Sequence, residues 1–410
     1  AAVSVSIVHY ALGIPQENTR LDGQLVRHIT SFLGTRGSEV PPRVLKSNEG
    51  AAVIGSFVLG IGFVFDDRTS EATSLARMRE LVERDIRNSE RVFAYVGGED
   101  LNTDPHQRSR RFIIDFGEMT EAEARRWPDL FAIIEAKVKP ARASVQQRDR
   151  REEWWRHATR SPVLRAFLYD KGRALAISQV TAHLAFSFID AGVVVSHTTV
   201  AVLIESFSGF AVLQSRVHET WARLLSSSMR TDLRYTPSDC FETFPFPRSD
   251  LRAVIPSLES MGDGLYSARA RFMADTQQGL TKTYNAIKDP SCDDPRILEL
   301  RRLHERMDRA VLDAYDWSDI AAPPYCPMTD EDRAAVQRFE DEVIDRLYLL
   351  NAERAREEAR LGIGGKKAKR PAAAGSDEPP PAEAAAKTKA RKKKGTGSGD
   401  GDGEQQGSLF

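Results

Sequence analysis

The fold is decided by the stretch that begins with Phe210-Ala-Val-Leu-Gln-Ser-Arg-Val-His-Glu-Thr-Trp221. It continues through Ser226-Ser-Ser228 and ends with Arg234-Tyr-Thr-Pro-Ser-Asp-Cys-Phe-Glu-Thr-Phe-Pro-Phe-Pro247. Val212, Val217 and Trp221 recur at helical spacing, which predicts an amphipathic helix with one buried stripe. The closing prolines cannot continue a helix, because proline lacks the amide hydrogen and fixes φ. The sequence therefore predicts a helix, a polar loop and a rigid extended exit.

Polar side chains flank the buried stripe and fill the loop that follows it. Guanidinium groups, hydroxyls and an aromatic ring after a helix form a surface suited to phosphate oxygens and bases. A core helix followed by an ordinary polar loop is the alternative interpretation. On the first interpretation, DNA contacts are predicted from Gln214, Ser215, Arg216, His218, Ser227, Ser228, Arg234, Tyr235 and Thr236.

A second basic stretch, residues 137–156, interleaves lysines and arginines with the pair Trp154-Trp155. Such a helix can follow a phosphate backbone while its tryptophans anchor it or stack on bases. The alternative is a solvated helix face with a Trp pair in the core, since neighbouring acidic residues dilute the charge. The predicted DNA-binding residues here are Lys139, Arg142, Arg148, Arg151, Trp155 and Arg156.

The sequence also resembles a known family. VLQSRVHETW, SSS and LRYTPSDCFETFPFP resemble the late target-recognition region of large single-chain DNA adenine methyltransferases, the type IIG restriction–modification enzymes and their relatives in BREX and DISARM phage-defence systems. Val92-Phe-Ala-Tyr-Val-Gly-Gly-Glu-Asp-Leu101 resembles the family's PYL-G-DL segment, and the likeness extends to about residue 360. The resemblance implies recognition of double-stranded DNA within a site-specific adenine-N6 methyltransferase that uses S-adenosylmethionine.

The expected fold class is α/β: a mixed α+β target-recognition domain, an α-helical C-terminal region and a disordered tail. Short β-branched runs at 174–178, 185–189, 193–196 and 200–204 predict one small twisted sheet. Apolar stripes at 300–314 and 336–350 predict two C-terminal helices, the second opened by a Thr329/Asp332 capping box. The expected divisions are the last strand of a truncated methyltransferase domain (1–12), the target-recognition domain (13–250), the helical region (251–361) and the basic tail (362–410).

Composition limits the classes of protein that fit. The chain has 410 residues, 41% of them hydrophobic, which is enough for two or three domains with a sizeable core. Its net charge of −1 requires that any DNA-binding surface be a local cluster of basic residues. Three cysteines without CxxC spacing argue against structural zinc and a disulfide framework and fit a reducing cytoplasm. No run has the length of a membrane span, so we expect a cytoplasmic protein without a membrane partner.

No catalytic residue is predicted. An amino-methyltransferase needs an Asn/Asp-Pro-Pro-Tyr/Phe loop for the flipped base and a Gly-rich turn for its cofactor, and neither is found here. The chain begins without Met, so we expect it to be the C-terminal part of a longer enzyme whose catalytic motifs precede residue 1, and to be inactive alone. Pro128-Asp129 followed by Glu135-Ala-Lys137 imitates a nuclease motif, but its carboxylates lie too close together on one helical segment to converge on a metal.

Two other interpretations concern partners. The chain could be a stand-alone DNA-binding specificity or interaction protein without an enzymatic parent. Its last residues, Gln406-Gly-Ser-Leu-Phe410, resemble the peptide with which bacterial proteins dock on the replication sliding clamp. Two large apolar side chains at the end of a basic tail have no core to join, so Leu409 and Phe410 are predicted to enter a partner's pocket while Gln406 bonds at its rim. Other defence-system subunits are further expected partners.

Overall fold

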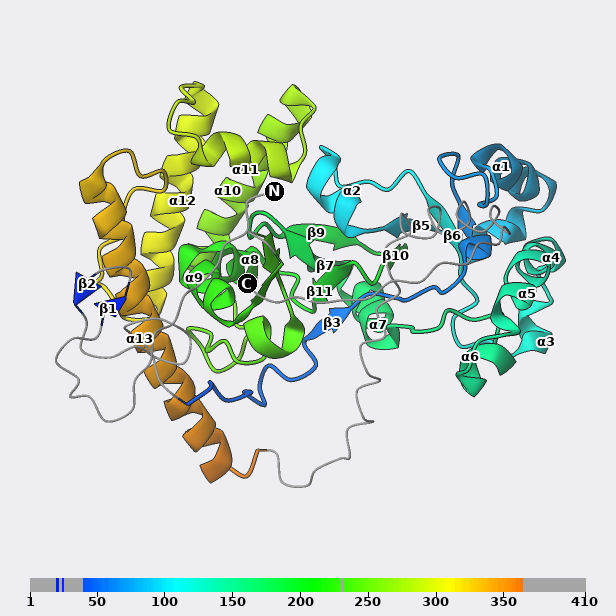
Figure 1. Cartoon of the computed structure of the whole chain (residues 1–410), viewed down its shortest axis with the longest axis horizontal. Coiled ribbons are helices and arrows are strands. Elements are labelled where there is room, and N and C mark those ends of the chain that lie inside the picture. The colour runs from blue at the N-terminus through cyan, green and yellow to red at the C-terminus, as the bar shows by residue number, and fades with distance from the viewer. Residues whose placement is uncertain (1–19, 22–23, 26–39, 230–231, 364–410) are drawn as a thin grey trace, which may run out of the picture. The chain divides into compact units, whose positions relative to one another are not determined.

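The computed structural model describes residues 40–229 and 232–363, together with a strand pair, β1 (Arg20–Leu21) and β2 (Gln24–Leu25). These residues belong to one compact unit that reaches Ile363 (Figure 1). Helices alternate with short strands, and the C-terminal part is helical, so the predicted mixed α/β class is confirmed. The predicted strand over residues 1–12 and the predicted tail, from Gly364 onward, lie outside the described residues.

The central sheet is antiparallel and has the strand order β3-β11-β7-β9. Alternate residues of its strands enter two different cores: Leu175 and Ile177 point into the larger one, whereas Ala174 and Ala176 point into a smaller one. Both faces are therefore buried, which explains why these strands are continuous apolar runs rather than alternating ones. The strands are β3 (Ala52–Ile54), β7 (Arg173–Ser178), β9 (Ser187–Asp190) and β11 (Thr199–Val202).

Helices cover both faces of this sheet (Figure 1). The larger core contains α8 (Phe207–Gln214), α9 (Arg216–Leu225), α10 (Pro256–Thr276), α11 (Leu280–Lys288), α12 (Pro295–Ala314) and α13 (Asp330–Arg360). The smaller core contains α2 (Gly98–Thr103) and α7 (Pro162–Lys171). Thr329 caps α13 reciprocally with Asp332, as the sequence predicts.

The second sheet has the order β10-β5-β6-β4, and its strands β4, β5 and β6 belong to a long excursion of the chain between Phe57 and Thr159. The Phe57 amide donates to the Thr159 carbonyl over 3.1 Å and the Thr159 amide donates to the Phe57 carbonyl over 2.9 Å, which closes the excursion at its base. The strands of the sheet are β4 (Val64–Phe65), β5 (Val92–Val96), β6 (Phe112–Ile114) and β10 (Val193–Val195). Besides α2, the helical turns within the excursion are η2 (Ile61–Phe63), α1 (Leu75–Arg84), η3 (Ile86–Arg91), α3 (Glu121–Ala124), α4 (Pro128–Lys137), α5 (Lys139–Arg142) and α6 (Arg148–Glu152).

One strand departs from the prediction of a single small sheet. β10 lies between β9 and β11 in sequence, but it pairs in parallel with β5 of the second sheet, Val194 opposite Tyr95. Its neighbours β9 and β11 pair with β7 instead. β10 therefore links the two sheets, and the single-sheet prediction is wrong for this strand.

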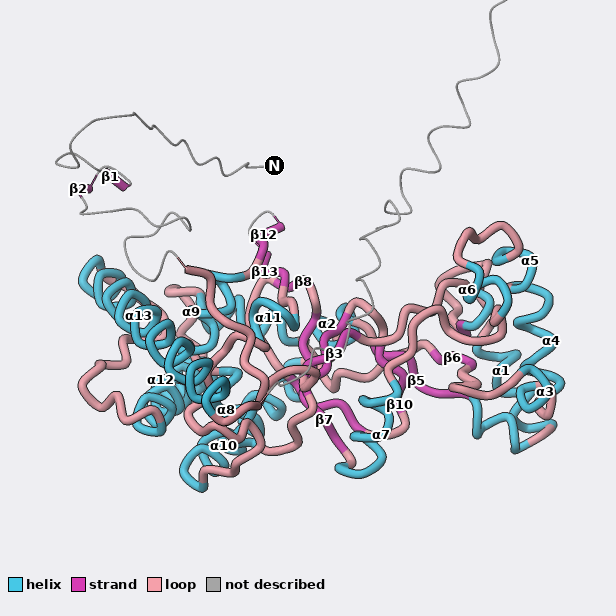
Figure 2. Tube along the Cα trace, turned by 90° about the horizontal axis from the view of Figure 1, so that it is seen from below, coloured by secondary structure: helices cyan, strands magenta, loops and turns pink. Residues whose placement is uncertain are grey.

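A third sheet of order β12-β13-β8 stands out from the helices in Figure 2. It is formed by β8 (Val180–Thr181), β12 (Ser227–Met229) and β13 (Asp232–Arg234). A π-helical turn, η4 (Pro237–Phe241), follows it and returns the chain to the core. This sheet occupies the place of the predicted polar loop.

The predicted helix over 210–225 is broken at Ser215. Ser215 is extended and acts as the N-cap of α9: its side chain accepts from the His218 amide over 3.4 Å and donates to the Val212 carbonyl over 2.7 Å. The predicted buried stripe is confirmed on both halves, since Val212, Val217 and Trp221 are buried.

Candidate nucleic-acid interface

The outer face of the third sheet carries two polar side chains in alternate positions of β13. Leu233 is 2% exposed and points inward, so Asp232 and Arg234 share the opposite face. Arg234 lies opposite Val180 of β8, which is 38% exposed. Within the described residues no ion pair or hydrogen bond uses the Asp232 or Arg234 side chain. A carboxylate acceptor and a guanidinium donor are therefore presented together; we call this face, with Val180, the hairpin surface.

A cavity of about 390 Å³ adjoins the hairpin surface, because Gln179 and Val180 form part of its wall. Another part of its wall is the segment Gly97-Gly98-Glu99, which belongs to the VGGEDL motif noted in the sequence. A Cβ on Gly98 would stand 2.3 Å from the Ser178 hydroxyl, so only glycine allows this loop to approach β7 so closely. Arg111 also lines the cavity and donates to Asp100 over 2.8 Å.

The loop 104–111 carries exposed arginines that sequence reasoning missed. The Asp104 carboxylate accepts from the His106 amide over 2.9 Å and from the Arg108 amide over 3.1 Å, which holds the loop in shape. Arg108 and Arg110 are exposed, and in the described part of the chain neither guanidinium group has an acidic partner. The signal available in the sequence is the cluster of arginines in Arg108-Ser-Arg-Arg111, which no motif singled out. These two side chains are suited to phosphate oxygens.

Four of the residues predicted to contact DNA are instead buried in the larger core or beside it. Gln214, Ser215, His218 and Tyr235 are at most 2% exposed, so they cannot reach a nucleic acid on the surface. Gln214 accepts from the Phe186 amide over 2.9 Å and donates to the Leu184 carbonyl over 2.8 Å. His218 Nε2 and the Tyr235 hydroxyl are 3.0 Å apart. Their prediction as DNA contacts is wrong, because helices pack on both sides of α8 and α9.

Arg216 is held in a structural ion pair. Its Nε donates to Asp308 Oδ2 over 2.6 Å, and its two terminal nitrogens donate to the carbonyls of Pro323 and Pro324. The Asp308 side chain is fully buried, and burial raises the pKa of its carboxyl although Arg216 opposes the shift. Each of its three nitrogens is bonded inside the protein and its side chain is only 11% exposed, so the structure gives Arg216 a structural role in place of the predicted DNA contact.

The basic stretch 137–156 does not form the predicted continuous helix; it folds into α5, α6 and turns. Arg142 is 1% exposed and donates to the carbonyls of Val58, Leu59 and Arg156, and burial lowers its pKa to about 10. Trp155 and Arg156 both donate to the Met119 carbonyl. These three side chains hold loops together, which corrects their predicted role and agrees with the alternative of a packed Trp pair.

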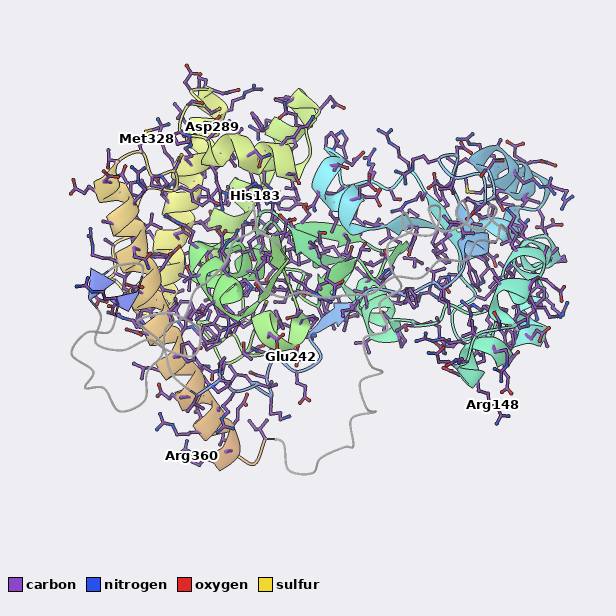
Figure 3. The ribbon with its side chains drawn as sticks, in the orientation of Figure 1. Arg148, His183, Glu242, Asp289, Met328 and Arg360 are labelled. Carbon is purple, nitrogen blue, oxygen red and sulfur yellow. The ribbon has the colours of Figure 1, made fainter. Side chains whose placement is uncertain are left out.

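The other predicted residues of this stretch, Lys139, Arg148 and Arg151, are exposed, but each already has a bonding partner nearby. Lys139 donates to Glu135 over 3.1 Å, and Arg148, which projects from the end of α6 in Figure 3, donates to Glu152 over 2.7 Å. Arg151 donates to the Val145 carbonyl over 3.0 Å. Near the hairpin surface, Thr236 donates to Asp239 over 2.8 Å. The side chains of Ser227 and Ser228 lie outside those that the structure describes.

Acid should weaken the fold through His218. Burial lowers the pKa of His218 from an ordinary 6.5 to about 3. As the pH falls, His218 is therefore protonated near pH 6.5 in the unfolded chain but stays neutral in the folded chain until about pH 3. Protonation favours the unfolded chain between these values, so stability that is present above pH 6.5 is lost as the pH falls. We expect His218 to contribute a loss of about 1.4 kcal/mol per pH unit in this range.

Urea unfolding at pH 7.5, 6 and 5 measures this dependence. His218→Asn should have a shallower decline than the unsubstituted chain, whereas His106→Asn, at an exposed histidine, should follow the unsubstituted chain. Equal slopes for His218→Asn and the unsubstituted chain would contradict the assignment.

The described residues contain no cluster of three or more histidine, cysteine or acidic side chains that could hold a metal ion. None of the helices among residues 40–363 combines the length and the apolar character needed to cross a bilayer.

Comparisons with known proteins show what this part of the chain is similar to. Residues 65–248 match the family model described as the MmeI target recognition domain. DNA methyltransferase A of Bacillus subtilis (strain 168) is 30% identical over 105 residues, which are 25% of this chain and 10% of that protein. The solved structure of the type IIL restriction–modification enzyme MmeI in complex with DNA matches with a TM-score of 0.55 at 17% identity, over 81% of this chain and 39% of that one.

The identity and coverage of each match limit what it shows about this chain. The structural match shows the fold, and the chain spans well under half the length of either relative. The matched range 65–248 contains the hairpin surface, the loop 104–111 and the cavity between them. The predicted resemblance to the target-recognition part of a type IIG-like methyltransferase is confirmed.

Proposed function

We propose that the chain reads a specific duplex DNA sequence for a site-specific DNA methyltransferase, on the premise that residues 65–248 match the model of the MmeI target recognition domain. The parent enzyme would methylate adenine at N6 with S-adenosylmethionine, in a cytoplasmic restriction–modification or phage-defence system of the type IIG kind. The catalytic motifs would lie in a part of the parent that these residues do not contain. We keep the division at residue 250 between recognition domain and helical region as part of this proposal.

The hairpin surface supports the reading of bases. A major groove admits a two-stranded β-ribbon, and β12–β13 is such a ribbon, with Asp232 and Arg234 on one face. Arginine donates in a bidentate manner to guanine, and aspartate accepts from the amino group of cytosine. Arg234 and Asp232 are thus suited to base edges, and this single observation carries the proposal.

The loop 104–111 supports the positioning of the duplex. Arg108 and Arg110 are exposed cations without an acidic partner among the described residues, unlike Lys139 and Arg148, which are paired. Neutralising a phosphate releases condensed counterions, so unpaired arginines give affinity that depends strongly on salt. We assign phosphate contacts to Arg108 and Arg110 and retain Lys139, Arg148 and Arg151 only as secondary positions.

Substituting the phosphate-contacting arginines should flatten the salt dependence of DNA binding. We expect the slope of log K against log [salt] to fall by about 0.9 for each phosphate that is no longer neutralised, hence by about 2 in Arg108→Ala/Arg110→Ala. The matched control is Arg148→Ala/Arg151→Ala, which removes the same charge from α6. Fluorescence anisotropy of labelled duplex at several salt concentrations gives both slopes. An unchanged slope in the first variant, with the second flattened, would move the phosphate contacts to α6.

Substituting the base-reading pair should change which sequence is bound. Asp232→Ala and Arg234→Ala should each weaken binding to the preferred site by about 1–3 kcal/mol and relax selection at one base pair, because a good bidentate contact discriminates by that amount. Selection from a randomised duplex pool measures the preference. If both variants select the same DNA sequence as the unsubstituted chain, the hairpin surface does not read bases.

The catalytic part of the proposal has its own test. The isolated chain should transfer no tritiated methyl group to DNA, and activity of the pure chain would contradict it. Docking of Gln406, Leu409 and Phe410 on a sliding clamp, like contact with other defence-system subunits, stays a prediction, since these residues lie outside the described set. A peptide of residues 400–410 should bind purified clamp at tens of micromolar and lose binding on Leu409→Ala/Phe410→Ala.

A further inference from the structure

The hairpin surface contains an apolar side chain, Val180, beside its two polar ones. Val180 is 38% exposed and lies directly opposite Arg234 in the β8–β13 pair. In the adjoining pair Thr181 lies opposite Leu233, and both are buried, so the alternation of the two strands places Val180 and Arg234 on one outer face. A single exposed valine is ordinary on a protein surface. This valine lies beside an arginine that is assigned to a base edge, so it meets the same DNA.

Hydrogen bonds hold the backbone of Val180 in place from both sides. The Gln179 amide donates to the Thr198 carbonyl over 2.8 Å, and the Gln179 carbonyl accepts from the Tyr235 amide over 2.8 Å. The Val180 carbonyl accepts from the Ser178 hydroxyl over 2.8 Å. The valine side chain is itself stiff, because both of its methyl groups are carried on Cβ. The apolar group is therefore fixed before DNA arrives, which lowers the entropic cost of a contact.

The outer flank of Val180 is open. Within the described residues β8 is an edge strand, with β13 on one side of it and no strand on the other. The cavity of about 390 Å³ lies beside it, with Val180 in its wall. A group on a bound duplex can therefore approach the valine without displacing another strand.

The side chains of Val180 and Arg234 differ in length, and this difference selects what the valine can touch. The Arg234 guanidinium lies several bonds beyond its Cβ, whereas Val180 ends one bond beyond its own. When Arg234 meets a base edge, Val180 therefore stands back from the floor of the groove and is reached by a group that projects from that floor. The apolar group that does so in the major groove is the C5-methyl group of thymine, and apolar side chains are suited to it.

The spacing limits which base is within reach. Cβ atoms directly opposite each other in an antiparallel pair are about 4.5–5.5 Å apart, and successive base pairs are about 3.4 Å apart. Val180 therefore reaches the base pair that Arg234 reads or one of its two neighbours. We propose that Val180 is a specificity-determining residue that reads the C5-methyl group of a pyrimidine in one of these three base pairs. Thymine carries this group, and cytosine carries it when it is methylated at C5. The inference rests on the proposed function and deepens it.

Altering one pyrimidine methyl group at a time tests the inference on the full chain. The base pair at which Arg234→Ala relaxes selection marks the position of Arg234. That base pair and its two neighbours each contain one pyrimidine, so thymine is replaced by deoxyuridine and cytosine by 5-methylcytosine. At one of the three positions, losing the methyl group should weaken binding about fourfold, or gaining it should strengthen binding about fourfold, which corresponds to the burial of one methyl group. Val180→Ala should reduce this response to less than about twofold, because the two changes remove the same contact.

Two further variants separate the contact from other effects. Val163→Ala is the matched control: it removes the same atoms from a valine that is 58% exposed on α7, which Figure 2 shows apart from the third sheet, so the full response should remain. Val180→Thr keeps the β-branched shape and one of the two methyl groups, so its response should lie between those of Val180→Ala and the unsubstituted chain.

The outcomes distinguish this inference from the proposed function. If binding is sequence-specific but none of the three methyl groups changes it, the inference is overturned and the proposed function stands. A response of equal size in Val180→Ala and the unsubstituted chain overturns it in the same way. If the unsubstituted chain has no sequence preference, or if Arg234→Ala relaxes selection at no base pair, the assignment of the hairpin surface fails and this inference fails with it.

Discussion

Arg216→Ala should lower the free energy of unfolding by about 3–5 kcal/mol, because it leaves the buried Asp308 carboxylate without its partner. The carbonyls of Pro323 and Pro324 lose their guanidinium donors in the same variant. Urea unfolding of the full chain at neutral pH measures the loss. Affinity for DNA, measured on the fraction that remains folded, should be unchanged.

The control for this prediction is Arg148→Ala, which removes an arginine of the same charge from an exposed position. The Arg148 side chain is 81% exposed, and among the described residues it pairs with Glu152 on its own short helix, so its loss should leave the stability almost unchanged. Arg216→Leu/Asp308→Leu should recover much of the stability lost in Arg216→Ala, since no buried charge is then unpaired. A stable Arg216→Ala protein with weakened DNA binding would reinstate Arg216 as a DNA contact.

Gly262→Ala should lower the free energy of unfolding by about 1–3 kcal/mol, because the added methyl group forces the backbone to move. Gly262 is where α10 crosses the start of α8, and a Cβ there would stand 2.2 Å from the Phe207 carbonyl oxygen. That neighbour is backbone within the larger core, so it cannot rotate aside as a side chain could.

Gly264, two residues further along the same helix, supplies the opposite expectation. A Cβ on Gly264 meets nothing within 4 Å, so Gly264→Ala should raise the stability by about 0.5–1 kcal/mol through the better helix propensity of alanine. Thermal and urea unfolding of the two variants side by side provide the measurement. Equal effects from both would mean that helix propensity, not the close approach of α8, governs this position.

The sequence predicts well wherever one local rule decides the structure. The β-branched run at 200–204 is observed as β11, the stripe through Val217 and Trp221 is buried, and the capping box opens α13. Ser215 shows the limit, because helical spacing of apolar residues continues across it while its hydroxyl caps a new helix. The pairing of β10 shows another limit, since the choice of partner strand depends on residues about a hundred positions away.

At the interface, the sequence does not predict which polar side chains are exposed and which are buried. Arg142 and Arg148 lie in the same basic stretch, yet one is held by three backbone carbonyls and the other is in solvent. Which arginine meets carbonyls depends on loops folded far away in sequence, such as residues 58–59. Arg234 could be predicted from its place after the hydroxyl-rich turn. Asp232, Arg108 and Arg110 required the strand register and the absence of ion pairs among the described residues.

The reciprocal hydrogen bonds between Phe57 and Thr159 bring the entry and exit of a long excursion together. A graft that replaces the segment between Phe57 and Thr159 with that of a relative needs only two junctions. At both junctions the two backbone strands are already joined by hydrogen bonds. The graft is not self-sufficient, because β5 within it takes β10 as its neighbour from outside. Recombination between relatives should therefore succeed when β10 travels with the excursion, and should leave an unpaired strand edge, prone to aggregation, when it does not.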